Sequence, residues 1–395
     1  MPASLLIGLK NNLDYTRHVY AHTRRLYPTL EIVLVSYNSI DGTHAWLDEL
    51  ADPYVRYYYD TTDRTLSDTY NKAIELATGE YVIFAHNDMV LAPGFIEALA
   101  VLQAPDRVVC YTTVEPPVFA DDPRPGKIVR DFGTDPETFQ GEAFTAFARG
   151  QQRQQELTGQ HVADRAQPSF FLCAARALLL ELGGLDPLFA PMFCEDDDLL
   201  LRLRLHGLTT VVSLDAICYH FVSKTSRFSA EYRALTRQIE GQSNRNFVRK
   251  WGFRPNGPVQ QTYDIGLVVP GADQAVLHRL EPWCRTLYTD ADTEAYRQAE
   301  QPATAIDLRT RLKPLHAPRT NGVLVTGPAR RLQRLTDEQL ATLPAVLHSR
   351  ISQPRSGLSQ LLARLFPTFR WQGLRIRIAN PATTERNLIR KPLTL

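Results

Sequence analysis

Two short clusters, about a hundred residues apart, contain the side chains best suited to chemistry. The first is His86-Asn87-Asp88, which directly follows the apolar run 81–84. The second is the acidic run 195–198, Glu-Asp-Asp-Asp, which directly precedes a leucine-rich segment typical of a helix. A carboxylate at the C-terminal end of a buried strand lies where open α/β sheets bind ligands. The first cluster can therefore hold a divalent metal on a diphosphate, while the second takes a proton.

The acidic run 195–198 has the surroundings that a general base requires. Four adjacent negative charges are unfavourable unless the helix dipole, a cation or water offsets them. Phe189, Met192 and Phe193 precede the run, and leucines follow it. A carboxyl group in such an apolar setting has a raised pKa, as proton abstraction from an alcohol requires. The alternative interpretation is a solvated helix cap.

A histidine, His220, is the other candidate ligand. It follows the apolar run 216–219 and precedes a segment of hydroxyl residues and Lys224. Imidazole can ligate Mn²⁺ or donate a hydrogen bond to phosphate, so His220 and Asp88 can share one metal or diphosphate site. The alternatives are a strand-end cap for Asp88 and purely structural roles for His86 and His220.

Alternating apolar strands and helices must position these residues. Between residues 5 and 84 the pattern predicts four strands separated by three helices, which is typical of a parallel sheet covered by helices. The stretch 115–165 interrupts the pattern with turn-forming residues, and a strand at 170–173 with a helix at 174–182 resumes it. The expected strands are 5–9, 31–35, 55–59 and 81–84, and the expected helices are 15–27, 44–50 and 67–77.

The length of 395 residues exceeds one ordinary core, so two domains are expected. The segment Pro255-Asn256-Gly257-Pro258 is typical of a linker, and we place the domains at 1–255 and 256–395. The second domain has no motif to which chemistry can be attached. Its expected strands, which predict a small α/β domain, are 265–269, 286–288, 305–308 and 322–325.

The order and spacing of the motifs resemble the inverting GT-A glycosyltransferases of family 2. The resemblance covers residues 4–252 and is specific as a set, because a chance match of all the pieces in order is improbable. The pieces that carry it are Ser39-Ile40-Asp41-Gly42-Thr43, Tyr70-Asn71-Lys72-Ala73, Thr78-Gly79-Glu80-Tyr81, Gly183-Gly184-Leu185-Asp186, the segment 195–202 and Tyr219-His220.

The resemblance implies a GT-A fold, which is a mostly parallel sheet with helices on both faces. It implies transfer of a hexosyl or deoxyhexosyl group from a nucleotide-sugar to an acceptor hydroxyl, with inversion. Asp196 is then the base, and Glu195 orients it or the acceptor. Asp88 and His220 hold Mn²⁺ or Mg²⁺. The expected nucleotide or donor residues are Ser36, Asp41, Asn71, His86 and Asn87, and the expected acceptor-side residues are Asp186, Asp198 and Arg202.

The sequence departs from the family pattern at two positions. Ser36 stands where the family has an acid at the end of the second strand, and His86 replaces the first Asp of the D-x-D motif. These departures leave open a nucleotide-sugar-binding module without catalysis, although the retained run 195–198 favours an enzyme. Nucleotidyl transfer is disfavoured because Lys10-Asn11-Asn12-Leu13 is not the Gly-rich phosphate loop that it would need.

The charge is unevenly distributed along the chain. Residues 308–395 contain 16 Lys or Arg and 3 Asp or Glu, whereas the whole chain has a net charge of +1. This stretch includes an amphipathic segment at 358–366, followed by Phe369 and Trp371. We expect a basic tail that makes weak peripheral contact with an anionic membrane and brings the enzyme to a glycan or lipid-linked acceptor. The alternative is that these arginines pair with the acidic front, within the chain or across an oligomer.

The remaining bulk features predict a cytoplasmic protein, with contact at the inner face of the membrane, that assembles a surface polysaccharide or another glycan. No apolar run reaches the roughly 18 residues of a membrane span, and no signal segment is present. The five cysteines are scattered without a C-x-x-C pair, which disfavours disulfides and zinc. Nucleic acid is not an expected partner, because aromatic residues suited to stacking are few.

Overall fold

The computed structural model describes residues 2–121, 124–164, 170–222, 232–255, 257–352 and 368–382. The chain divides into two compact units, of which the first extends to Ile239 and the second begins at Glu240. The division falls within helix α8 (Thr236–Trp251), ahead of the linker proposed from the sequence at 255–258.

The first unit contains a mixed, mostly parallel sheet with the strand order β3-β2-β1-β4-β9-β6-β10-β5. Strands β1 to β4 pair in parallel, as do β6 and β10, whereas β9 and β5 pair antiparallel with their neighbours. Two short strands, β7 and β8, flank β6 and β10. The strands are β1 (Ala3–Leu9), β2 (Glu31–Tyr37), β3 (Val55–Asp60), β4 (Tyr81–His86), β5 (Met89–Leu91), β6 (Arg107–Glu115), β7 (Lys127–Val129), β8 (Val162–Asp164), β9 (Leu172–Ala175) and β10 (Thr209–His220).

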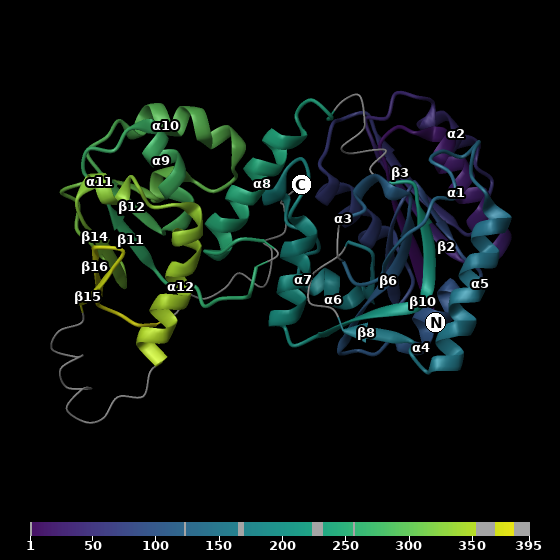
Figure 1. Ribbon diagram of the computed structural model, residues 1–395. Coiled ribbons are helices and arrows are strands. Elements are labelled where there is room, and N and C mark those ends of the chain that lie inside the picture. The colour runs from purple at the N-terminus through teal and green to yellow at the C-terminus, as the bar shows by residue number, and fades with distance from the viewer. Residues whose placement is uncertain are drawn as a thin grey trace. The chain divides into compact units, whose positions relative to one another are not determined.

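Helices cover both faces of this sheet, which confirms the predicted α/β class. The central strands are continuous apolar runs because both of their faces are buried. Figure 1 shows α1 and α5 on one side of the sheet and α3, α6 and α7 on the other. The helices are α1 (Leu13–Leu26), α2 (Thr43–Glu49), α3 (Leu66–Leu76), α4 (Phe95–Leu102), α5 (Gly141–Thr158), α6 (Arg176–Glu181) and α7 (Glu195–Leu205).

The strand register brings several predicted site residues to one edge of the sheet. Gly8 of β1 pairs with His86 of β4, and Leu9 of β1 pairs with Ser36 of β2. The chain runs from β1 to β2 on one side and later returns to β4 on the other. The crevice outside such strand ends is where open α/β sheets bind ligands. The turn after β4, with Asp88, therefore lies in the expected binding position.

The second unit is a smaller mixed sheet with helices, as the sequence predicts. Its strand order is β13-β12-β11-β14-β16-β15, and β14, β16 and β15 pair antiparallel. The strands are β11 (Ile265–Val268), β12 (Thr286–Thr289), β13 (Leu312–Pro314), β14 (Val323–Thr326), β15 (Thr368–Trp371) and β16 (Leu374–Ile378). The helices after α8 are α9 (Gln274–Leu280), α10 (Thr293–Glu300), α11 (Ala329–Leu332) and α12 (Asp337–Ser352).

The strand predicted at 305–308 is wrong. Residues 308–310 form a 3₁₀ helix, and the strand follows at β13. The Asp307 carboxylate accepts a hydrogen bond from the backbone N–H of Arg309 at 3.0 Å, which starts the turn. Asp favours such local bonds over a strand ladder.

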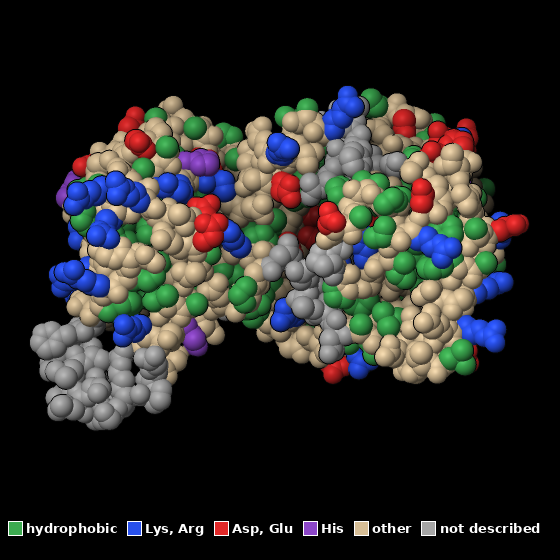
Figure 2. Space-filling view, in the orientation of Figure 1, with side chains coloured by type: hydrophobic (Ala, Val, Ile, Leu, Met, Phe, Trp, Pro, Cys, Tyr) green, Lys and Arg blue, Asp and Glu red, His purple; other side chains and the backbone are tan. Residues whose placement is uncertain are grey.

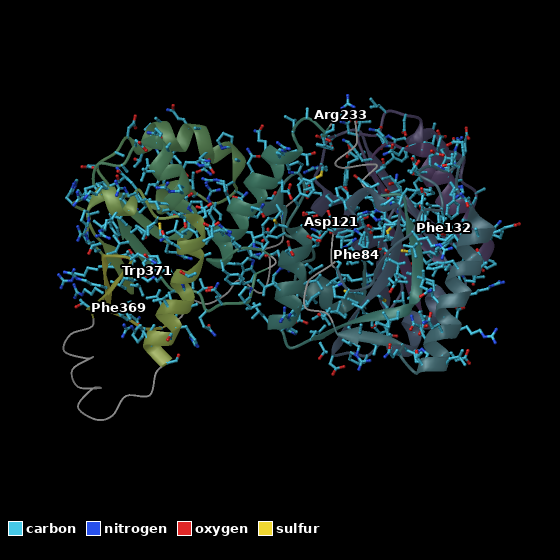
Figure 3. All side chains as sticks on the ribbon, viewed as in Figure 1. Phe84, Asp121, Phe132, Arg233, Phe369 and Trp371 are labelled. Atoms are coloured by element: carbon cyan, nitrogen blue, oxygen red, sulfur yellow. The ribbon has the colours of Figure 1, made fainter. Side chains whose placement is uncertain are left out.

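The predicted basic tail is largely a folded part of the second unit. Helix α12 and the hairpin of β15 and β16 occupy much of the stretch 308–395. Trp371 is buried in the same core as the helices, so it is not an exposed membrane anchor; Figure 3 shows it and Phe369 beside this hairpin. The predicted amphipathic segment 358–366 lies outside the described residues. Among the helices that the structure does describe, none is long and apolar enough to cross a bilayer.

Candidate active site

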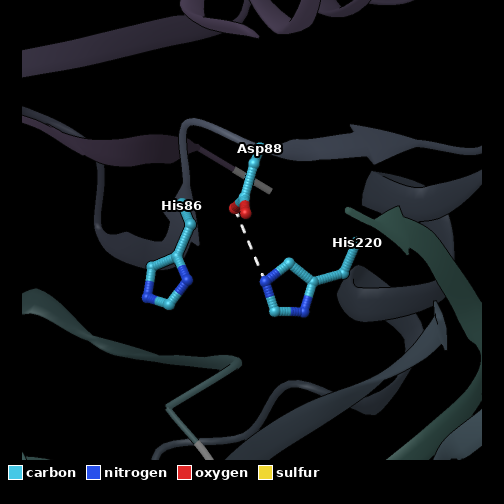
Figure 4. Close-up of side chains that lie close together, drawn as sticks. All are labelled: His86, Asp88 and His220. Atoms are coloured by element: carbon cyan, nitrogen blue, oxygen red, sulfur yellow. Dashed lines mark ion pairs between the residues drawn. The ribbon is translucent and has the colours of Figure 1, made fainter. Parts of the chain in front are cut away.

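Two histidines and one carboxylate converge at the C-terminal edge of the first sheet. His86 ends β4, Asp88 lies in the turn after it, and His220 ends β10. One potential ligand atom from each of the three lies within 4.8 Å of the others. Figure 4 shows the three side chains turned toward one another. The Nε2 atom of His220 is 3.5 Å from Oδ1 of Asp88. The structure thus brings together the two predicted metal ligands and adds His86.

A second buried carboxylate, Glu115, supports His220 and was missed by the sequence reasoning. It ends β6, which pairs in parallel with β10. Its Oε1 atom lies 3.2 Å from Nδ1 of His220 and also accepts hydrogen bonds from Arg124 at 2.8 Å and Thr113 at 2.9 Å. Glu115 follows an apolar run just as Asp88 does, and that was the available signal. The prolines that follow it led us to assign it to a loop.

The three ionisable groups beside Asp88 have strongly shifted pKa values. Burial alone would lower the pKa of His220, but Asp88 and Glu115 raise it to about 9. Burial lowers the pKa of His86 to about 4, although Asp88 opposes this. Burial would raise the pKa of Glu115, yet His220 and Arg124 hold it well below its usual range. The site therefore favours a positive charge between Asp88 and Glu115.

The donor set fits a divalent transition metal better than magnesium. Imidazole and carboxylate together suit Mn²⁺, whereas Mg²⁺ prefers oxygen ligands alone. Three protein ligands leave coordination positions for phosphate oxygens. The contact of Glu115 with the far nitrogen of His220 is the usual support for a metal-binding imidazole. Of the two ions predicted from the sequence, Mn²⁺ is the better match.

The acidic run forms the first turn of α7, after a strained entry. Phe193 and Cys194 adopt φ values of 75° and 68°, a left-handed conformation that bulky residues seldom adopt. Glu195 is buried, and its pKa is raised well above the usual range by burial and by the negative charge of Asp196. Asp196 and Asp197 remain partly exposed. The raised pKa expected for this run is therefore found on Glu195.

A buried tyrosine, Tyr70, packs behind the metal cluster. The Tyr70 hydroxyl donates to the carbonyl of Ala85 at 2.7 Å. Burial raises its pKa above the usual range, and the negative charges of Asp88 and Glu195 add to this rise. The Phe170 ring lies 4.7 Å from that of Tyr70 and 5.0 Å from that of His86, measured between centroids. Tyr70 thus packs through Phe170 beside His86, the first residue of the metal cluster.

The residues predicted on the acceptor side are engaged in internal contacts. Asp198 and Arg202 are fully buried and form an ion pair at 2.8 Å. Arg202 also donates to the carbonyls of Leu182 and Gly184. Asp186 caps a 3₁₀ turn by accepting a hydrogen bond from a backbone N–H at 2.9 Å. These contacts shape the turn before α7, and a role of the three residues toward an acceptor stays a prediction.

This buried ion pair leads to a stability prediction. Arg202→Ala should lower the free energy of unfolding by about 3–5 kcal/mol, because it breaks a fully buried ion pair. Urea denaturation measures the change. Arg204→Ala, at an exposed position of the same helix, is the matched control and should stay within about 0.5 kcal/mol. Equal stability of the two variants would contradict the structural role of Arg202.

Ser36 and Asp41 lie at the sheet edge near the start of α1. Ser36 is buried at the end of β2, and its hydroxyl donates to Ser39 Oγ at 2.8 Å and lies 3.1 Å from Nε2 of His44. Asp41 is exposed and accepts a hydrogen bond from the backbone N–H of Leu13 at 2.8 Å. The Ser36 hydroxyl and the His44 imidazole therefore lie where the family pattern has a carboxylate. The sequence analysis did not identify His44.

The two predicted asparagines use their amides inside the protein. The side-chain amide of Asn71 donates a hydrogen bond to the carbonyl of Leu185 at 2.9 Å and accepts one from the backbone N–H of Leu185 at 2.8 Å. A Cβ atom at Gly184 would lie 2.1 Å from the Asn71 amide oxygen, so this position needs glycine. Asn87 donates to the hydroxyl of Thr16 at 3.0 Å. Both amides shape loops around the site, and direct contact with a nucleotide stays a prediction.

The first part of the chain matches a known protein family. Residues 4–167 match the family described as glycosyl transferase family 2. This part of the chain is a glycosyl transferase family 2 domain. The family 2 domain contains His86, Asp88 and Glu115, whereas Glu195 and His220 lie in the chain beyond the matched residues.

Solved structures of glycosyltransferases resemble the chain at low sequence identity. The mannosyltransferase PcManGT from Pyrobaculum calidifontis, in complex with GDP-Man and Mn²⁺, is 20% identical, with 63% of each chain covered and a TM-score of 0.42. S. aureus TarS 1–349 is 14% identical, covering 62% of this chain and 72% of its own, with a TM-score of 0.41. GalNAc-T7 with UDP, GalNAc and Mn²⁺ is 12% identical, covering 65% and 53%, with a TM-score of 0.43. The match thus spans less than two thirds of the mannosyltransferase and about half of GalNAc-T7. No curated protein matches the sequence.

Proposed function

We propose that the protein transfers a glycosyl group from a nucleotide-sugar to an acceptor hydroxyl, with inversion and with Mn²⁺ as cofactor. The observation that carries this proposal is the cluster of His86, Asp88 and His220, of which the first two lie within the matched family 2 residues. The acidic start of α7 follows later in the chain. The cluster supplies ligands for a cation on a diphosphate, and the helix start supplies carboxyl groups for the acceptor.

Each side chain has a defined task in this proposal. His86, Asp88 and His220 hold Mn²⁺, which acts as a Lewis acid toward the leaving diphosphate when bound. Asp196 takes the proton of the acceptor hydroxyl, because it is partly exposed at the helix start and can reach a bound acceptor. Glu195 is buried next to Asp196, with a pKa raised by burial and by the charge of Asp196, and it orients its neighbour or the acceptor.

The alternative function is a nucleotide-sugar-binding module without catalysis. Its basis is the replacement of family acids by Ser36 and His86. The position of His86 within the cluster weakens this alternative, because an imidazole there still supplies a metal ligand. Release of nucleoside diphosphate from a panel of nucleotide-linked hexoses and deoxyhexoses in Mn²⁺ tests the two. Turnover of at least one donor supports the enzyme, and tight binding without turnover of any donor supports the module.

The acceptor is proposed from the chemistry of the reaction class alone. A hydroxyl of a glycan or of a lipid-linked glycan, in the assembly of a surface polysaccharide on the cytoplasmic side of a membrane, fits a base at the start of α7. Incubation of the active donor with short oligosaccharides and with lipid-linked ones identifies the class. If the protein hydrolysed the donor but transferred the sugar to neither class of oligosaccharide, this choice of acceptor would be contradicted.

Glu115 is proposed to position His220 for the cation. Glu115→Gln should weaken Mn²⁺ binding about 10- to 100-fold, because the carboxylate that orients the imidazole is lost. Titration followed by electron paramagnetic resonance of free Mn²⁺, without nucleotide, measures the affinity independently of turnover. Glu142→Gln, at an exposed site on α5, is the control and should bind Mn²⁺ normally. A folded Glu115→Gln protein with unchanged Mn²⁺ affinity would contradict the role.

A further inference from the structure

The sheet of the second unit has one face without helices among the residues that the structure describes. Apolar side chains of α9, α10, α11 and α12 all join one core with the other face, which includes Leu267, Val325 and Ile376. The opposite face contributes Val268 and Leu324 to a small cluster that only the segment after β13 covers. Toward the β15–β16 edge, the same open face carries arginines.

Three arginines define this surface, which we name the arginine face: Arg370, Arg375 and Arg377. Arg375 and Arg377 alternate with the buried Leu374 and Ile376 along β16, so they point away from the core. Arg370 lies directly opposite Arg375 in the antiparallel ladder and therefore on the same face. All three are exposed. Figure 2 shows Lys and Arg gathered over the edge of this unit where β14, β16 and α11 lie.

The chain provides no counter-charge for the arginine face in its described part. Like charges directly opposite each other in a ladder are destabilising, yet Arg370 and Arg375 form such a pair. Residues 339–384 contain no Asp or Glu. Within the residues that the structure covers, no carboxylate forms an ion pair with Arg370, Arg375 or Arg377. An uncompensated cluster of this kind indicates a partner that brings negative charge.

We propose that the arginine face docks the protein on an anionic lipid surface. The three guanidinium groups project from the open face of one strand pair, which suits a flat, laterally extended array of negative headgroups. Large exposed hydrophobic side chains are absent from described residues 260–382, so the contact is electrostatic and does not insert into the bilayer. A nucleic acid strand would need exposed aromatic rings for stacking, and Tyr288 on this face is buried. The proposal rests on the second unit alone and adds a route to a lipid-linked acceptor.

Vesicle binding by the full chain tests this proposal. Vesicles of phosphatidylcholine with and without phosphatidylglycerol are sedimented with the protein at low and high salt. The triple variant R370Q/R375Q/R377Q should bind anionic vesicles on the order of 100-fold more weakly, because each basic residue near such a surface contributes roughly fivefold. The matched control is R254Q/R285Q/R309Q, which removes the same charge at exposed sites outside the arginine face and should change binding by less than about threefold. High salt should release the wild-type protein.

Several results would overturn the proposal. Equal losses for the two triple variants would mean that diffuse charge, not the arginine face, binds the lipid. Absence of protein binding to anionic vesicles at low salt would exclude the lipid surface. Binding of the protein to a soluble polyanion such as heparin, without binding to vesicles, would exclude it as well. A lower melting temperature of R370Q/R375Q/R377Q would indicate a structural role, whereas removal of opposed charges should leave it unchanged or higher. Turnover with a soluble acceptor should be unaffected, which separates this proposal from the proposed function.

Discussion

Asp196→Asn should lower glycosyl transfer by about 10²–10⁴-fold, the range typical of losing a general base. The amide cannot accept the acceptor proton, and the rest of the helix start is unchanged. Nucleotide affinity should stay within a few-fold of wild type, because the proposed contact of Asp196 is with the acceptor. Steady-state transfer and calorimetric titration with nucleoside diphosphate in Mn²⁺ measure the two quantities separately.

Asp197→Asn is the matched control for this experiment, since Asp197 is partly exposed in the same helical turn and has the same charge. It should retain most of the turnover. If Asp196→Asn retained most of its turnover instead, the base would have to be another group. Loss of turnover in Glu195→Gln alone would then assign the role to Glu195, despite its buried position and raised pKa.

The strands and helices of the first unit could be predicted because their local signals are strong. The run before His86 is apolar on both faces, as a central parallel strand must be. The acidic residues of α7 lie at its N-terminus, where the helix dipole favours them. Local pattern alone therefore placed Asp88 after a buried strand and the acidic run at the start of a helix.

The contact of Glu115 with His220 could not be predicted, because it depends on the pairing of strands far apart in the sequence. The two residues are separated by 105 positions, and only the parallel pairing of β6 with β10 brings them together. The hydrophobic periodicity and the secondary-structure propensity of a segment predict its conformation, but they do not predict which strands lie beside it in a sheet. The bonds of Arg202 to the carbonyls of Leu182 and Gly184 also could not be predicted, because they depend on how α7 packs against the turn after α6.

The hairpin of β15 and β16 within the basic tail was not predicted, because the sequence analysis weighed the charge of this stretch and not its periodicity. Leu374-Arg375-Ile376-Arg377-Ile378 alternates apolar and charged residues, which is the pattern of a half-buried strand. Net charge describes partners and solubility rather than fold. This alternation of apolar and charged residues predicts β16 and places Arg375 and Arg377 on one exposed face of the strand.

The second large effect concerns the metal cluster. Asp88→Ala and His220→Ala should each weaken nucleoside diphosphate binding in Mn²⁺ by on the order of 100-fold or more, because the cation links the protein to the phosphates. In EDTA both variants should bind like wild type. Calorimetric titration with nucleoside diphosphate in each condition provides the comparison, and His161→Ala, at an exposed histidine outside the cluster, is the control for loss of an imidazole.

His86 offers the sharpest test of whether the cluster is a metal site. His86→Asp restores the carboxylate of the family motif and makes the ligand set richer in oxygen. Mg²⁺ prefers oxygen ligands and Mn²⁺ accepts imidazole, so this variant should gain affinity for Mg²⁺ relative to Mn²⁺. If His86 were only structural, the substitution would not change the relative affinity for Mg²⁺ and Mn²⁺.

Equal nucleotide affinity of the wild-type protein with and without Mn²⁺ would remove the cation from the proposed mechanism. The ion pair of His220 with Asp88 would then be a structural contact at the sheet edge.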